Sequence, residues 1–102
     1  MPEVSQSNSK IMERKMQMAQ ANLLARASVL QLCGVKESVY TNCHPYIGMM
    51  SFHFGNIELS FDDEHPYSDS EVEETIKALD AKIEEQAKRA NKTLEVIKAW
   101  RG

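Results

Sequence analysis

The last third of the chain, residues 68–102, most constrains the fold because it has the pattern of one uninterrupted helix. It contains no proline, and its only glycine is residue 102. Ser68 with Glu71, and Ser70 with Glu73, have the spacing of a capping box. Apolar residues recur at steps of three and four, at Val72, Ile76, Leu79, Ile83, Ala87, Ala90, Leu94 and Ile97. The spacing predicts a helix from near residue 69 almost to residue 102.

Such a helix is too long for one small domain to cover. About thirty residues make a rod of roughly 45 Å, whereas a compact chain of this size has a radius of gyration of about 13 Å. We therefore expect a second copy to bury the stripe, in a homo-oligomer that is a dimer or larger. The predicted oligomer interface consists of Val72, Ile76, Leu79, Ile83, Ala90, Leu94, Ile97 and Trp100.

The first third predicts another helix. Residues 1–8 are polar and aperiodic, so we expect a flexible tail there. A helix follows from Lys10 to Cys33 and ends at Gly34. One apolar stripe comprises Met12, Met16, Ala19, Leu23, Ala27 and Leu30, and a second beside it comprises Ile11, Met18, Ala25, Val29 and Leu32. An apolar face this broad indicates contact with more than one neighbour.

The middle of the chain predicts a β-hairpin. Gly55-Asn56 separates two alternating runs and is a recognised two-residue turn. The simplest register places three apolar pairs on one face and His53 opposite Glu58 on the other. The apolar pairs are Phe54 with Ile57, Phe52 with Leu59, and Met50 with Phe61. Residues 37–41 have the pattern of a short strand or an irregular segment, and residues 42–45 that of a turn.

The predicted fold class is therefore α+β, mainly α: helix, β-hairpin, long helix (α-β-β-α). Residues 9–102 form its single domain. The helices are expected to pack antiparallel or nearly so, as a coiled-coil-like pair or an oligomeric bundle. The chain resembles the prefoldin β-type chaperone subunit in this order of elements and in the acid- and lysine-rich final helix. The resemblance is one of topology, and no motif accompanies it.

Charge is distributed unevenly along the chain. Residues 37–74 contain nine acidic residues and no Lys or Arg, whereas the segments on either side carry a small positive excess. An acidic centre repels phosphates, which makes nucleic-acid binding unlikely. The acids either keep the loops solvated or form a surface for a basic partner. The chain has two cysteines, and neither a leader peptide nor a membrane-spanning run is evident, so we expect a cytoplasmic protein with reduced thiols.

Residues 40–67 hold the candidate binding residues. All three histidines and six of the seven aromatic residues lie in this segment. Packing in β structure alone also gathers aromatic residues. If the chain contacts a ligand or partner here, the candidates are Tyr40, His44, Tyr46, His53, Glu58, His65 and Tyr67.

No pattern for catalysis, metal binding or a cofactor is present. Zinc sites favour close pairs of ligands, and only Cys43 and His44 are close. The same two residues are the only nucleophile and base that are near in sequence, and adjacent side chains seldom meet. The chain has no P-loop, dinucleotide fingerprint or nucleophile elbow. We expect no enzyme activity, catalytic residues, metal or cofactor.

The leading hypothesis is a non-enzymatic, oligomeric protein-interaction module that acts through the acidic, aromatic segment 40–67. Such a module is an adaptor, an assembly chaperone or an inhibitor. One alternative is a small-ligand binding or sequestering protein with a pocket formed between subunits. A further alternative is an acidic mimic of nucleic acid, whose binding to a target collapses with salt.

Overall fold

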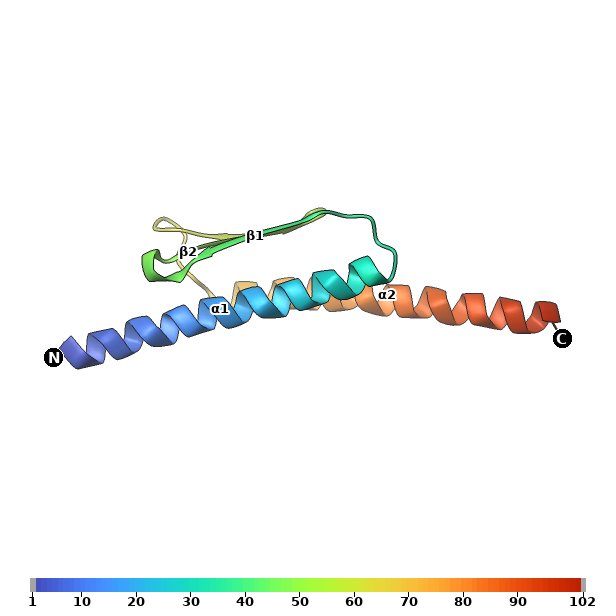
Figure 1. Ribbon diagram of the computed structural model, residues 1–102, viewed down its shortest axis with the longest axis horizontal. Helices are drawn as coiled ribbons and strands as arrows, with labels where there is room; N and C mark the ends of the chain where they lie inside the picture. The colour runs from blue at the N-terminus through green and yellow to red at the C-terminus, as the bar shows by residue number, and fades with distance from the viewer. Residues whose placement is uncertain (1, 102) are drawn as a thin grey trace.

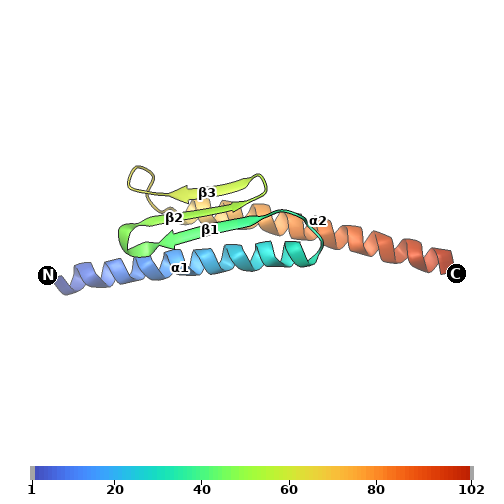
Figure 2. The same ribbon diagram turned by 45° about the horizontal axis from the view of Figure 1, so that its top comes forward.

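The computed structural model describes the backbone of residues 2–101 and the side chains of residues 10–91 and 98–100. It contains helix α1 (Pro2–Leu32), strand β1 (Val39–His44), the short 3-10 helix η1 (Pro45–Ile47), strands β2 (Met49–Phe54) and β3 (Ile57–Phe61), and helix α2 (Asp69–Arg101). The strands form one antiparallel sheet in the order β1-β2-β3. Both helices lie on the same side of this sheet (Figures 1 and 2). The prediction of a mainly helical α+β protein is confirmed.

The hairpin between β2 and β3 has the predicted register. Phe52 pairs with Leu59, and His53 pairs with Glu58. Gly55 opens the turn with φ +60°, and no residue other than glycine has a positive φ within the described backbone. A two-residue hairpin turn of this kind requires glycine at its first position. Alternation and turn chemistry were therefore sufficient to predict this element.

Strand β1 is the main departure from the prediction. Residues 42–45 were expected to be a turn, but β1 continues to His44 and pairs with all of β2, from Val39 opposite Phe54 to His44 opposite Met49. Its alternate residues Val39 and Cys43 pack against the core, which explains why a third strand is stable here. The chain turns later, through η1 and Gly48, whose φ is +70°. The fold is α-β-β-β-α.

The third strand reverses the direction of α2. Each antiparallel strand turns the chain around, so three strands return it in the direction of α1, whereas the predicted two would have left the helices antiparallel. Lys15 bonds to Asp69 and Arg26 to Asp80, and both pairs are separated by 54 residues. A constant separation is possible only for parallel helices, as Figure 1 shows. The expected antiparallel packing is wrong, and the resemblance to prefoldin in the order of elements does not extend to this fold.

Helix α1 begins earlier than predicted. The backbone of residues 2–8, where a flexible tail was expected, is helical. Pro2 occupies the first helical position, where its fixed φ suits a helix and its missing N–H group has no partner to lose. The side chains of residues 1–9 lie outside the described part of the chain.

The core lies between the sheet and the two helices. Phe52, Phe54 and Phe61 are its largest fully buried side chains. The other buried apolar residues are Met16, Ala19, Leu23, Ala27, Leu30, Met50, Leu59, Val72 and Leu79. The first apolar stripe of α1 thus faces the sheet, apart from Met12, which is 39% exposed. Among the described side chains, Thr75 is the one buried polar residue, and its hydroxyl donates to the carbonyl oxygen of Glu71.

Candidate functional site

The predicted interface on α2 divides into two parts. Val72 and Leu79 are buried in the core, and Ile76 and Ile83 are partly buried and pack against it. Val72 and Leu79 are therefore covered by their own chain, which corrects their assignment to a surface for a second copy, whereas Ile76 and Ile83 are covered only in part. Their stripe faces α1 and the sheet because α2 lies alongside both.

The second part of α2 extends beyond the body of the protein (Figure 1). Ala90 is exposed, and Trp100 is 90% exposed. The side chains of Leu94 and Ile97 lie outside the described residues. The molecule measures 72 × 21 × 18 Å, with a radius of gyration of 18.1 Å, well above the roughly 13 Å of a compact chain of this length.

Four of the predicted binding residues lie on the side of the sheet that faces away from the helices, which we call the outer face. Tyr40 and His53 have ring centroids 5.9 Å apart, and His53 Nδ1 lies 3.6 Å from Glu58 Oε1. These three residues make a row across β1, β2 and β3. His44 stands at the end of β1, near a shallow cavity of about 100 Å³. Exposed polar rings on a sheet offer contacts but no enclosed site.

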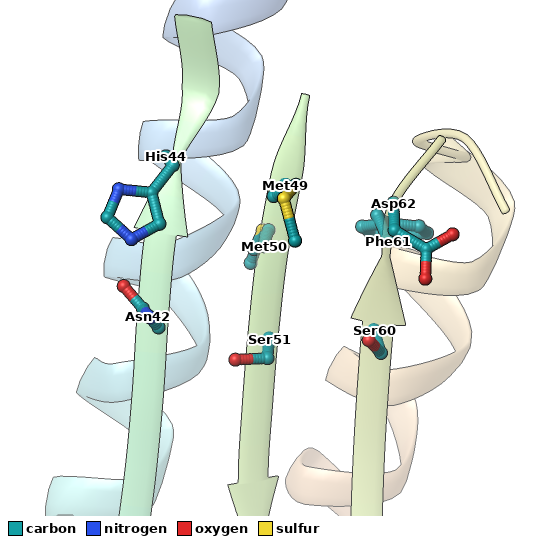
Figure 3. Close-up of a pocket in the computed structure, with 8 residues that line it drawn as sticks. All are labelled: Asn42, His44, Met49, Met50, Ser51, Ser60, Phe61 and Asp62. Carbon is teal, nitrogen blue, oxygen red and sulfur yellow. The ribbon is translucent and has the colours of Figure 1, made fainter. Parts of the chain in front are cut away.

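Figure 3 shows this cavity and the side chains around it. Asn42 and His44 belong to β1, Ser51 belongs to β2 and Asp62 directly follows β3. Their side chains do not converge on one point. Small-molecule pockets usually have volumes of about 300–1,000 Å³. The outer face is therefore too shallow to enclose such a ligand within one chain.

The other predicted residues lie at one end of the sheet. His65 stacks on Phe61 with parallel rings at 5.8 Å, and its Nε2 lies 2.7 Å from a carboxylate oxygen of Glu71. Tyr67 also packs on Phe61, at 5.1 Å. Asp62 fixes this loop, since its side chain accepts hydrogen bonds from the backbone N–H groups of residues 64 and 65. The loop between β3 and α2 is thus held by hydrogen bonds and ring contacts.

Tyr67 and Asp69 influence each other's ionisation. Burial, a hydrogen bond to Asp69 and the charge of that carboxylate together raise the pKa of Tyr67 to about 12. The same hydrogen bond, followed by the bond to Lys15, lowers the pKa of Asp69. Lys15 belongs to α1, so this network links α1 to the start of α2.

A second cavity, of about 260 Å³, lies beside Tyr67. Its lining residues are Met12, Met16, Gly48, Asp62, Asp63, Pro66 and Tyr67. The adjoining η1 carries Tyr46, which is 75% exposed, and Ile47, which is 52% exposed. We define the end surface as Met12, Tyr46, Ile47, Met49, Asp62, Asp63 and Pro66. It combines exposed apolar groups with carboxylates.

Sequence reasoning named Tyr46 as a binding residue and included most of the other residues only as part of the segment 40–67, and it missed Met12. Met12 precedes Asp62 by fifty residues in the sequence, and only the packing of η1 and the β3–α2 loop against α1 brings the two together. The concentration of methionines near the N-terminus and the acidic run at residues 62–64 were the available signals.

Cys43 and His44, which the sequence analysis considered as a nucleophile and a base, lie on opposite faces of the sheet. Cys43 faces the core and His44 the outer face, because alternate residues of a strand point in opposite directions. Burial raises the pKa of the Cys43 thiol, which disfavours the reactive thiolate. Both cysteines are free. Within the described side chains, no three His, Cys, Asp or Glu residues are grouped as metal ligands.

Comparison with protein-family models, curated proteins and solved structures gives no match. A search of the described helices for a stretch long and apolar enough to cross a bilayer found none.

Proposed function

We propose that this protein is a non-enzymatic protein-interaction module that uses the end surface to bind a basic segment of a partner protein. The observation that carries the proposal is the placement of Asp62 and Asp63 beside a cavity of about 260 Å³ lined by Met12 and Met16. An apolar hollow with carboxylates at its edge suits an apolar side chain flanked by Lys or Arg.

The exposed residues around the hollow support the same kind of partner. Tyr46, Ile47 and Met49 are all more than 40% exposed, although large apolar groups normally lie in the core. Aromatic residues and methionine are enriched in protein interfaces, and methionine adapts to irregular partner surfaces. No Lys or Arg lies between residues 37 and 74, so nothing in that segment neutralises the carboxylates.

The small-ligand alternative has weaker support within one chain, because both cavities are smaller than a usual ligand pocket. A catalytic role has weaker support as well, since Cys43 and His44 lie on opposite faces of the sheet. We place the module in the cytoplasm on the basis of its two unpaired cysteines.

An NMR titration with synthetic peptides tests the proposal. One peptide carries a leucine between lysines, and its counterpart carries the same leucine between glutamates. We expect the basic peptide to shift amide signals of residues 46–49 and 62–67, with an affinity that falls as salt rises. Asp63→Asn should weaken binding about fivefold, the equivalent of roughly 1 kcal/mol.

Glu74→Gln is the matched control, because it removes an exposed carboxylate of α2 outside the end surface. It should leave binding unchanged. Equal binding of the two peptides, or equal losses in the two variants, would refute the proposal.

A further inference from the structure

The side of α1 that faces away from the sheet carries an uncovered apolar stripe. We call it the back stripe: Ile11, Met18, Ala25, Val29 and Leu32. It was the second stripe in the sequence, and neither the core nor the end surface uses it. Met18 is 65% exposed and Leu32 is 88% exposed. Since the residues of α1 that face the sheet are fully buried, the exposure of the back stripe is not explained by poor packing.

The spacing of the back stripe indicates that its occupant is a helix. Ile11, Met18, Ala25 and Leu32 are seven residues apart, and Val29 lies four residues after Ala25. A seven-residue repeat is the signature of a helix that packs along another helix. From residue 11 to residue 32 the stripe extends over about 32 Å, which is the contact length of two long helices.

The order of large and small residues matches a second copy in the antiparallel direction. If the two-fold axis lies between residues 21 and 22, Ile11 packs against the partner's Leu32, and Met18 packs against the partner's Ala25. The exposed Ala21 lies near the axis, where a small side chain allows the helices to approach. The large side chain at each end of the stripe therefore meets the large side chain at the opposite end of the partner's stripe, as an isologous interface requires.

Charges on α2 favour the same direction. The fixed separation of 54 residues places Glu73 and Lys77 level with residues 19 and 23 of α1, on either side of the axis. Both are exposed, and both lie on the side of α2 that faces away from the sheet. Antiparallel packing brings Glu73 near the partner's Lys77 and the reverse. Parallel packing about a two-fold axis would place the two α2 helices on opposite sides of the α1 pair, where no such pairs form.

We propose that the back stripe is a homodimer interface, in which the α1 helices of two copies pack antiparallel and the two sheets lie on the outside. The interface lies on α1 and not on the α2 stripe expected from the sequence. It leaves both end surfaces free, so the dimer does not depend on the proposed function.

Sedimentation velocity over a concentration series tests the interface. We expect a reversible monomer–dimer equilibrium in the wild-type protein, and at least a tenfold weaker association in Met18→Glu/Val29→Glu. Asn42→Glu/Ser60→Glu is the matched control, since both positions are exposed on the outer face, on the opposite side of the sheet from the back stripe. It should dimerise like the wild type. A wild-type protein that stays monomeric at high micromolar concentration, or a dimer that both double variants retain, would overturn the proposal.

Disulfide trapping tests the direction in a background of Cys33→Ser/Cys43→Ser. Ala21→Cys lies near the axis and should form an interchain disulfide under mild oxidation. Leu32→Cys should not, because its two copies would be about 32 Å apart. A parallel dimer would trap both, and binding of a different protein to the stripe would trap neither; either result would refute the antiparallel homodimer. Circular dichroism of each variant establishes that it is folded.

Discussion

Arg26 donates a hydrogen bond from Nε to Asp80 Oδ1 over 2.8 Å, and this pair joins α1 to α2. The Arg26 side chain is 28% exposed and that of Asp80 is 51% exposed, so solvent screens the pair only in part. Arg26 also donates to the carbonyl oxygen of Asn22, which holds its guanidinium in place.

We predict a modest coupling energy for this pair. A double-mutant cycle of Arg26→Ala and Asp80→Ala should give about 0.5–1 kcal/mol, within the range of partly exposed ion pairs. Urea unfolding measures each variant, and the coupling should decrease as salt increases. A coupling of zero would show that the two side chains do not meet in solution.

The parallel direction of the helices predicts a long distance between Lys10 and Lys98. In a Cys33→Ser/Cys43→Ser background, spin labels on cysteines at these two positions should be about 50 Å apart, given 1.5 Å per residue along parallel helices. Pulsed electron resonance on labelled protein diluted with unlabelled protein measures the distance within one chain. Antiparallel helices would bring the labels close together.

Phe52→Ala should destabilise the fold by about 3–5 kcal/mol, because it leaves a cavity where a fully buried ring had been. If that variant does not fold, Phe52→Leu should fold with a loss of about 1.5 kcal/mol. Tyr40→Ala, on the outer face, is the control and should change the stability by less than about 0.5 kcal/mol. Chemical unfolding gives all three values. Equal losses for Tyr40→Ala and Phe52→Leu would contradict the assigned core.

Gly48→Ala should cost about 1–2 kcal/mol through the backbone alone. Gly48 has φ +70°, and no atom lies within 4 Å of the added Cβ position, so no clash contributes. Gly48→Asn should recover part of the loss, since asparagine tolerates the left-handed region better. Thermal unfolding compares the variants. If alanine and asparagine were equally tolerated, the left-handed conformation at Gly48 would be wrong.

Protonation of Asp69 should contribute to the loss of folding stability at acidic pH. The hydrogen bond from Tyr67 and the interactions with Lys15 lower the pKa of Asp69 in the folded state. The contribution of Asp69 to folding stability is therefore complete above its pKa in the unfolded chain, about 3.9. This contribution is lost as the pH falls through the lower pKa of the folded state. Urea midpoints from neutral to acidic pH should fall less steeply in Asp69→Asn, and Tyr67→Phe should reduce the slope in part. An unchanged slope in both variants would exclude the network.

The sequence predicted the elements better than their arrangement. The β2–β3 register followed from Gly55 and the alternation around it. Residues 37–41 were considered as a short strand or an irregular segment, and the full strand β1 was missed because its inward residues are only half-buried, with a polar Thr41 among them. Thr41 is accommodated because its hydroxyl accepts from Gln20 and donates to the carbonyl oxygen of Ser51, a contact that no local pattern encodes. Missing this strand also produced the wrong direction for α2.

The sequence predicted the segment that contains most of the candidate site, but not the residues from other segments that pack against it. Residues 40–67 do contain the outer face and most of the end surface, because β-rich segments carry aromatic and polar rings together. Met12 and Glu71 escaped the prediction, since each reaches the segment only through tertiary packing.

The part of α2 that projects past α1 has the geometry of a lever arm. From residue 87 onward it leaves the body as a single rod with the exposed ring of Trp100 near its tip. A slight tilt where α2 meets the core would move that indole through a much larger arc.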